Sequence, residues 1–196
     1  MRAPGGWRRW PGSKKGEDMS AVEPALFRRV LGAEVFDALP ASVRRLHLRQ
    51  GQARYRGEVE IQRGSGLLSR LCAWATRLPE AGIGPIEVEI HAEDGREIWT
   101  RHVGAHAMRS RLWCKRGMLC ERLGLVTFGF RLHSEDADIV WRVESVRAIG
   151  VPLPVAWFKQ VRARESAESG RYRFEVVAAL PIAGPLVHYK GALDVD

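Results

Sequence analysis

The first candidates for chemistry are three titratable side chains in a row, His188, Tyr189 and Lys190, near the end of the 196-residue chain. Successive side chains of a β-strand point to opposite faces of the sheet. In "LVHYKGALDV" this alternation places Tyr189 with the apolar Val187 and Leu193, and places His188 and Lys190 on the other face. The three residues therefore do not form a proton-transfer cluster. We expect Tyr189 on the inner face and the other two in solvent.

A second polar set lies in "REIWTRHVGAHAMRSRLWCKRGMLCERLG", residues 96–124. Two-residue turns at 104–105 and 116–117 would pair the strands so that one mainly apolar face carries four polar residues: Arg101, His106, Ser110 and Glu121. Buried charges must pair, reach the rim or meet a ligand. The two interpretations are structural ion pairing and a pocket, and a register slip of one residue would invert the assignment. The candidate ligand-binding residues are Trp99, Arg101, His106, Ser110, Glu121 and Tyr189.

No catalytic or metal-binding motif accompanies these residues. The chain has no Gly-rich phosphate loop after a strand, no Gly-x-Ser-x-Gly elbow and no specific metal-ligand spacing. His102 and His106 flank one turn, but their assigned faces differ, which disfavours joint metal ligation. We therefore predict no cofactor and no metal, and the sequence leaves open whether the protein is an enzyme.

The three cysteines, Cys72, Cys114 and Cys120, are an odd number without a secretory signal, which predicts a cytoplasmic protein. They are most simply small apolar residues, and a redox pair of Cys114 with Cys120 is the less favoured alternative. The chain has no run of about 18 apolar residues, so we predict no transmembrane helix.

The formal net charge of +8 is carried in part by the opening segment. Residues 1–19 are basic, rich in Gly and Pro and without a hydrophobic period, so we predict a disordered leader and Met19 as an alternative start. Trp7 and Trp10 stand on either side of Arg8 and Arg9, which would allow peripheral membrane contact. Deleting residues 1–19 should leave the melting temperature unchanged.

Three short helices are predicted at the beginning of the folded part, in "EPALFRRVLG" (23–32), "PASVRRLHLRQG" (40–51) and "SGLLSRLCAWATRLP" (65–79). Ser42 is a candidate cap of the second. In the third, apolar residues recur at helical spacing and form a stripe: Leu67, Leu68, Leu71, Cys72, Ala75 and Leu78. We expect this helix to plug the sheet and Leu71→Ala to be severely destabilising.

After the helices the hydrophobic period changes to two, in "RYRGEVEIQ", "IEVEIHA", "VTFGFRL", "RYRFEVVAAL" and "LVHYKGALDV". Short loops such as "EDGR", "KRGM" and "AESGR" join antiparallel neighbours. Residues 20–196 are therefore predicted to form a single α+β, mostly β domain. We expect an antiparallel meander of about eight to ten strands, curved into a half-barrel or barrel-like sheet packed on the short N-terminal helices.

The segments "FRRVLG…FDALPASVRRLH", "ERLGLVTFGFRL" and "GPLVHYKGAL" resemble the bacterial domain of unknown function 4166 family, from about Ala25 to Asp194. The resemblance implies a single β-rich domain and no catalytic residues to carry over. Members of the family are sometimes fused to dehydrogenase-like domains of the saccharopine type. By that analogy, the resemblance implies an accessory role and a dehydrogenase-like partner.

Three functions remain open from the sequence. The first is a binding module that holds a small hydrophobic or amphipathic ligand, and the second is an enzyme of unrecognised type using Glu121, His106 or Tyr189. The third is a structural partner that docks through a basic outer face, on which the hairpin pattern places Arg162, Arg164, Arg171 and Arg173. Nucleic acid is disfavoured, because this stripe has no aromatic rings on the same face.

Overall fold

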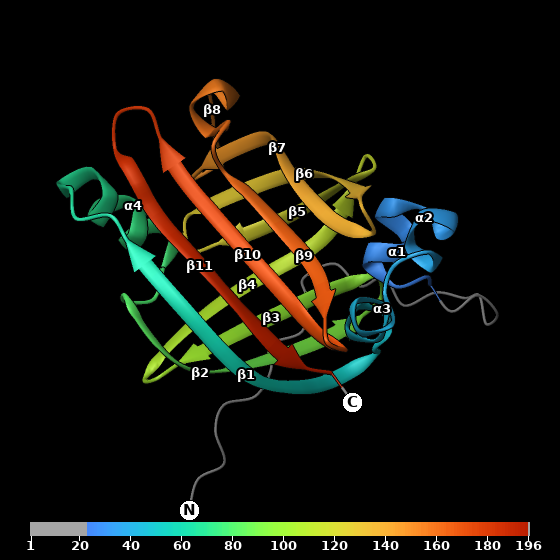
Figure 1. Cartoon of the computed structure of the whole chain (residues 1–196). Helices are drawn as coiled ribbons and strands as arrows, with labels where there is room; N and C mark the ends of the chain where they lie inside the picture. The colour runs from blue at the N-terminus through green and yellow to red at the C-terminus, as the bar shows by residue number, and fades with distance from the viewer. Residues whose placement is uncertain (1–22, 196) are drawn as a thin grey trace, which may run out of the picture.

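The computed structural model describes residues 23–195 and shows a closed antiparallel β-barrel with helices at both ends (Figure 1). The sheet order is β6-β5-β4-β3-β2-β1-β11-β10-β9-β7-β8, and β6 also pairs with β7, so ten strands close the barrel while β8 extends from β7. The predicted mostly β, barrel-like class is confirmed, with eleven strands rather than eight to ten. The strands are β1 (Gly51–Arg63), β2 (Gly82–Glu93), β3 (Arg96–Val103), β4 (His106–Lys115), β5 (Met118–Leu123), β6 (Val126–Glu135), β7 (Asp138–Ala148), β8 (Val151–Leu153), β9 (Arg162–Glu168), β10 (Arg171–Leu180) and β11 (Gly184–Asp194).

Tight turns fix the register of consecutive strands. Asp94 and Gly95 have φ values of 50° and 63°, and Arg116 and Gly117 have 53° and 73°. Turns with positive φ at both central residues match the right-handed twist of the strands that they join. The resulting pairs include Val103 with His106 and Leu112 with Glu121, as the sequence predicts.

The barrel closes through strand pairs that are distant in the sequence, β1 with β11 and β7 with β9. Gly57 of β1 is paired with Leu193 of β11, and a Cβ there would stand 1.8 Å from the carbonyl oxygen of Ala192. Only glycine fits this corner of the barrel.

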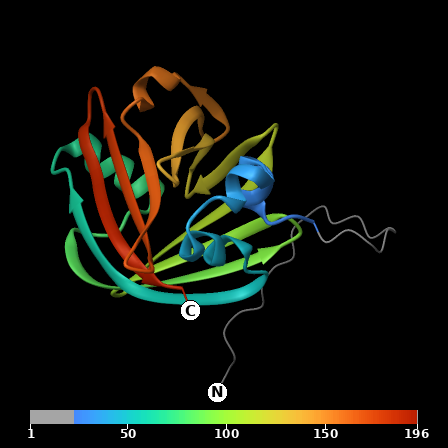
Figure 2. The same cartoon turned by 45° about the vertical axis from the view of Figure 1, so that its right-hand side comes forward.

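The N-terminal helices α1 (Leu26–Leu31), α2 (Ala33–Asp37) and α3 (Ala41–Leu48) close one end of the barrel (Figure 2). Five of their apolar side chains are buried and fill that half of the interior: Leu26, Phe27, Phe36, Val43 and Leu46. The Ser42 side chain makes no cap hydrogen bond, so the predicted cap is wrong, and α3 begins after Pro40 instead. Helix α2 was not predicted, because five residues carry too little periodicity. Within residues 23–195, no helix is both long and apolar enough to cross a membrane.

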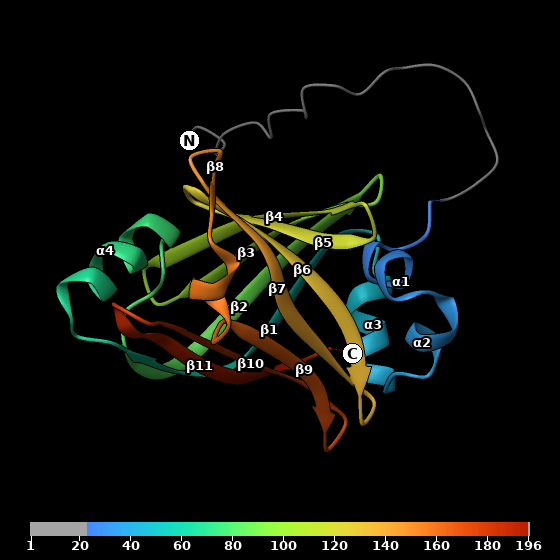
Figure 3. The same ribbon diagram turned by 90° about the horizontal axis from the view of Figure 1, so that it is seen from above.

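Helix α4 (Leu67–Thr76) lies at the opposite end of the barrel from α1–α3 (Figure 3). It buries only the small residues Ser69 and Ala73, whereas Leu67 is 82 % and Leu71 59 % exposed. The prediction that the leucine stripe is buried is therefore wrong. Because Leu71 is exposed, Leu71→Ala is not expected to be severely destabilising. Periodicity shows which residues share a helix face, but not whether that face meets a core or an open end.

Short polar contacts hold α4 in place. The amide of Leu125 donates to the carbonyl of Ala75 at 3.1 Å, and the His106 ring donates to the carbonyl of Arg77 at 2.9 Å. The one-turn helix η1 (Val155–Phe158) follows β8 at the same end. The three cysteines are free thiols.

Candidate functional site: a cavity inside the barrel

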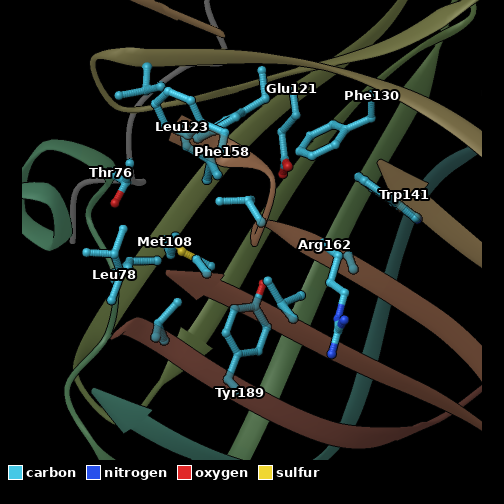
Figure 4. A pocket seen from close by; sticks show the side chains of 18 of the residues that line it. Thr76, Leu78, Met108, Glu121, Leu123, Phe130, Trp141, Phe158, Arg162 and Tyr189 are labelled. Atoms are coloured by element: carbon cyan, nitrogen blue, oxygen red, sulfur yellow. The ribbon is translucent and has the colours of Figure 1, made fainter. Parts of the chain in front are cut away.

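Between the helical plug and α4 the barrel encloses a cavity of about 390 Å³. Inward-facing residues of nine barrel strands contribute to its wall, which is mainly aliphatic and aromatic; among them are Val88, Met108, Leu123, Phe130, Val176 and Leu186 (Figure 4). Leu71 and Trp157 also line the cavity and are exposed to solvent. The cavity therefore opens at the α4 end, and its volume lies within the range of small-molecule sites.

The polar part of the wall is built by β3, β4 and β5. The Arg101 guanidinium donates to Ser110 Oγ at 3.0 Å and to Glu121 Oε1 at 3.5 Å, and it lies 5.0 Å from the centre of the Trp99 ring. The side chains of Arg101 and Glu121 are 12 % and 7 % exposed. The hairpin registers bring these residues onto one face, so an ion pair and a pocket wall occur together.

Tyr189 approaches from the opposite side. Figure 4 shows its hydroxyl and the Glu121 carboxylate pointing into the cavity from β11 and β5. Burial raises the pKa of Tyr189, so its hydroxyl stays protonated and can donate a hydrogen bond. Trp141 also lines the cavity, and its buried indole N–H has no hydrogen-bond partner among residues 23–195. The cavity thus presents the Glu121 carboxylate as an acceptor and the Tyr189 hydroxyl as a donor in apolar surroundings.

A buried network at the inner end of the cavity was missed by the sequence analysis. His47 Nε2 donates to Glu165 Oε2 at 2.5 Å, and the His47 ring stacks on Phe27 with centroids 3.6 Å apart. Burial, followed by the nearby Glu165 charge, raises the pKa of Tyr172 well above its usual value. Glu165 and Tyr172 line the cavity, whereas His47 stands behind them on α3. A pair separated by 118 residues leaves no local pattern in the sequence.

Glu97 is the second buried carboxyl in this region, and it accepts a hydrogen bond from the Trp99 indole at 2.7 Å. Burial raises the pKa of Glu97 to about 7, and the charge of Glu165 acts in the same direction. Glu97 shares the face of Trp99, two residues away on β3, so the strand pattern alone could have placed it inside.

Four of the six predicted site residues line the cavity, namely Trp99, Arg101, Glu121 and Tyr189. Ser110 is buried behind them as the partner of Arg101. His106 lies outside the cavity wall, where it holds the end of α4. His188 and Lys190 lie on the outer surface. The His188 ring is 2.7 Å from the Glu175 carboxylate, and the Lys190 ammonium is 3.2 Å from the Glu60 carboxylate.

The cavity has no constellation that indicates a particular reaction. Within the described part of the chain, no group of three or more His, Cys, Asp and Glu side chains could hold a metal ion. The predicted basic outer stripe is largely neutralised, because Arg164 pairs with Asp138 at 2.6 Å and Arg171 with Asp194 at 2.7 Å. Arg173 likewise pairs with Glu168, whereas Arg162 forms no ion pair within the described part of the chain and contributes to the cavity wall.

Fold and site define a closed β-barrel that is plugged by helices at one end and holds an apolar cavity open at the other. The chain belongs to the family described as Domain of unknown function (DUF4166), whose family model matches residues 39–193. The match runs from just before α3 to the end of β11 and so includes both the barrel and α4. The resemblance drawn from the sequence motifs is thereby confirmed. A search of the curated proteins found no match.

Proposed function

We propose that this protein holds a small apolar or amphipathic molecule inside the barrel. The observation that carries the proposal is the cavity of about 390 Å³, with a mainly apolar wall and an opening to solvent at α4. A site of this kind gains affinity from apolar burial and orientation from a few polar groups.

The polar groups favour an amphipathic ligand with at least one oxygen or nitrogen atom. The Tyr189 hydroxyl can donate to such an atom, and the Glu121 carboxylate can accept from one. Arg101 already contacts Glu121 and Ser110, so Arg162 is the one charged residue of the wall without an ion partner in the described part of the chain, and it is exposed to solvent.

The test is native mass spectrometry of gently purified protein, followed by extraction and identification of any bound molecule. The variant Val176→Trp places an indole in the cavity, whereas Val177→Trp places it at the next position of β10, outside the cavity wall. We expect a bound molecule in the wild type and in Val177→Trp, and its loss in Val176→Trp. Equal occupancy in the two variants, or empty wild-type protein that binds no apolar fluorescent probe, would contradict the proposal.

The enzyme alternative would use Glu121 or Tyr189 on the bound molecule, and a product found beside its precursor in the extract would support it. A structural partner docking on the outer arginines is less favoured, because three of the four, Arg164, Arg171 and Arg173, are paired on the barrel. We retain a cytoplasmic location from the cysteine usage, and a dehydrogenase-like partner from the family resemblance, as parts of this proposal.

A further inference from the structure

The α4 end of the barrel carries most of the exposed large apolar side chains of the described chain. Thirteen large apolar side chains within residues 23–195 are exposed, and all but Val35 and Leu48 lie on segments at this end. They stand on α4, on the strand turns and beside η1; the most exposed include Leu67, Trp74, Ile83, Ile149 and Ile182. We call this end the mouth. Exposed apolar residues concentrated in one region mark an interaction surface.

The mouth is also basic, and its basic side chains lack acidic partners. The loops and strand ends that form it, residues 63–81, 104–105, 122–126, 147–161 and 181–183, contain one acidic residue, Glu80. They contain six basic residues, none of which forms an ion pair with any residue of the described part: Arg63, Arg70, Arg77, Arg122, Arg147 and Lys159. At the helical end some basic side chains are paired, Arg28 with Asp37 at 2.8 Å and Arg29 with Glu23, whereas Arg44 and Arg49 form no ion pair within the described part.

The geometry points to an anionic lipid bilayer as the occupant of the mouth. Protruding leucine, isoleucine and tryptophan side chains with basic residues around them match the acyl and headgroup layers of such a surface. The cavity opens within the same region, between Leu71 and Trp157, so docking would bring its entrance against the lipid.

A second copy of the chain is a poorer fit, because two mouths placed face to face would oppose their unpaired positive charges. A protein partner would need an acidic surface shaped to several separate protrusions. This inference goes beyond the proposed ligand binding, since a barrel with an empty cavity would dock in the same way.

The test is cosedimentation of the full chain with vesicles of phosphatidylcholine alone and of phosphatidylcholine mixed with phosphatidylglycerol. We expect binding to the anionic vesicles to be at least about tenfold stronger and to weaken as salt is added. The double variant Ile149→Glu, Ile182→Glu changes two exposed side chains of the mouth and should lose at least about tenfold in affinity.

The matched control is Val35→Glu, Leu48→Glu, which introduces the same charges at exposed apolar positions of the helical end. It should bind vesicles nearly as well as the wild type, because only the added net charge acts. A wild type that sediments with neither vesicle, or variants that lose affinity equally, would overturn the proposal. Unchanged binding of the mouth variant would also overturn it, since another surface, such as residues 1–19, would then be responsible.

Vesicle binding also separates this inference from the proposed ligand binding. Val176→Trp should lose the internal ligand and keep vesicle affinity, whereas the mouth variant should lose vesicle affinity and keep the cavity. Failure of one proposal is thus distinguishable from failure of the other.

Discussion

Glu121 is placed to affect both the stability of the barrel and ligand binding in the cavity. Its carboxylate is buried against Arg101 and also points into the cavity. Removing one partner of a buried pair leaves the other charge without compensation, which costs more than the pair itself contributes.

We therefore predict that Glu121→Gln keeps the fold and lowers the free energy of unfolding by about 2–3 kcal/mol. Retention of the internal ligand should fall as well, because the amide preserves the size of the side chain but not its charge. The control Glu87→Gln removes a charge that two exposed arginines share, and it should cost less than about 1 kcal/mol. Thermal melts measure the stability of both variants, and native mass spectra measure their retention of the ligand. If neither stability nor ligand retention changes in Glu121→Gln, its carboxylate does not contribute to the site.

Glu97 predicts a dependence of stability on pH. Its pKa is raised from 4.5 to about 7, so the folded protein binds this proton more tightly than the unfolded chain does. The resulting stabilisation is complete below about pH 4.5 and is lost as the pH rises to about 7. Its full size is about 3 kcal/mol.

The variant Glu97→Gln should consequently be more stable than the wild type at pH 8, by up to about 3 kcal/mol, and similar to it at pH 4.5. The amide oxygen can still accept the hydrogen bond from the Trp99 indole. Urea denaturation at several pH values measures the difference between the two proteins. A difference that is the same at every pH would show that folding does not raise the pKa of Glu97.

At the scale of elements, α3 and α4 contribute very differently to stability. Leu46 of α3 is 1 % exposed in the helical plug, whereas Leu71 of α4 faces the mouth. We predict that Leu46→Ala costs about 2–5 kcal/mol and that Leu71→Ala costs less than about 1 kcal/mol. Chemical denaturation of the two variants tests this. The reverse order of costs would mean that α4, not α1–α3, plugs the barrel.

The attachment of α4 depends on the turn between β5 and β6. Gly124 has a φ of 53°, and a Cβ there would stand 2.4 Å from the carbonyl oxygen of Ala75. Gly117 also has positive φ, at 73°, but a Cβ there would meet nothing within 4 Å. Comparing the two glycines separates backbone strain from contact with α4.

Gly117→Ala should cost about 1 kcal/mol through strain alone. Gly124→Ala should cost more and should also make residues 64–80 easier to cleave, because the turn can no longer hold Ala75. Limited proteolysis followed by mass spectrometry locates the cleavage. If the two variants behave alike, the turn does not secure the helix.

The elements that could be predicted are those whose determinants are local. Two-residue turns fixed the registers of β3, β4 and β5, and with them the meeting of Arg101, Ser110 and Glu121. Closure of the barrel depends on β1 with β11 and β7 with β9, whose pairing no local pattern encodes. For the same reason the His47–Glu165 contact was missed. The predicted stripe does lie on one side of α4, but an exposed apolar helix face and a buried one have the same spacing of apolar residues in the sequence.

On the scale of the whole molecule, the barrel has one filled end and one open end. Phe27 stacks on His47 and lies 5.6 Å from the Trp141 ring, so the helical plug and the barrel wall share one aromatic core. At the mouth, α4 is held by a few hydrogen bonds and two small buried residues. Local opening should therefore be confined to the α4 end, since regions with few buried apolar contacts open at the lowest free energy.

We predict that the backbone amides of residues 67–76 exchange with solvent deuterium at least about tenfold faster than those of residues 41–48. Both segments are α-helical, so the difference would report how each helix is packed rather than its secondary structure. A ligand in the cavity should slow exchange in residues 67–76, because Leu71, Cys72 and Ala75 line its wall. The cavity-filled variant Val176→Trp should show no such ligand effect. Equal protection of the two helices would mean that α4 is a fixed wall and that a ligand must enter by another route.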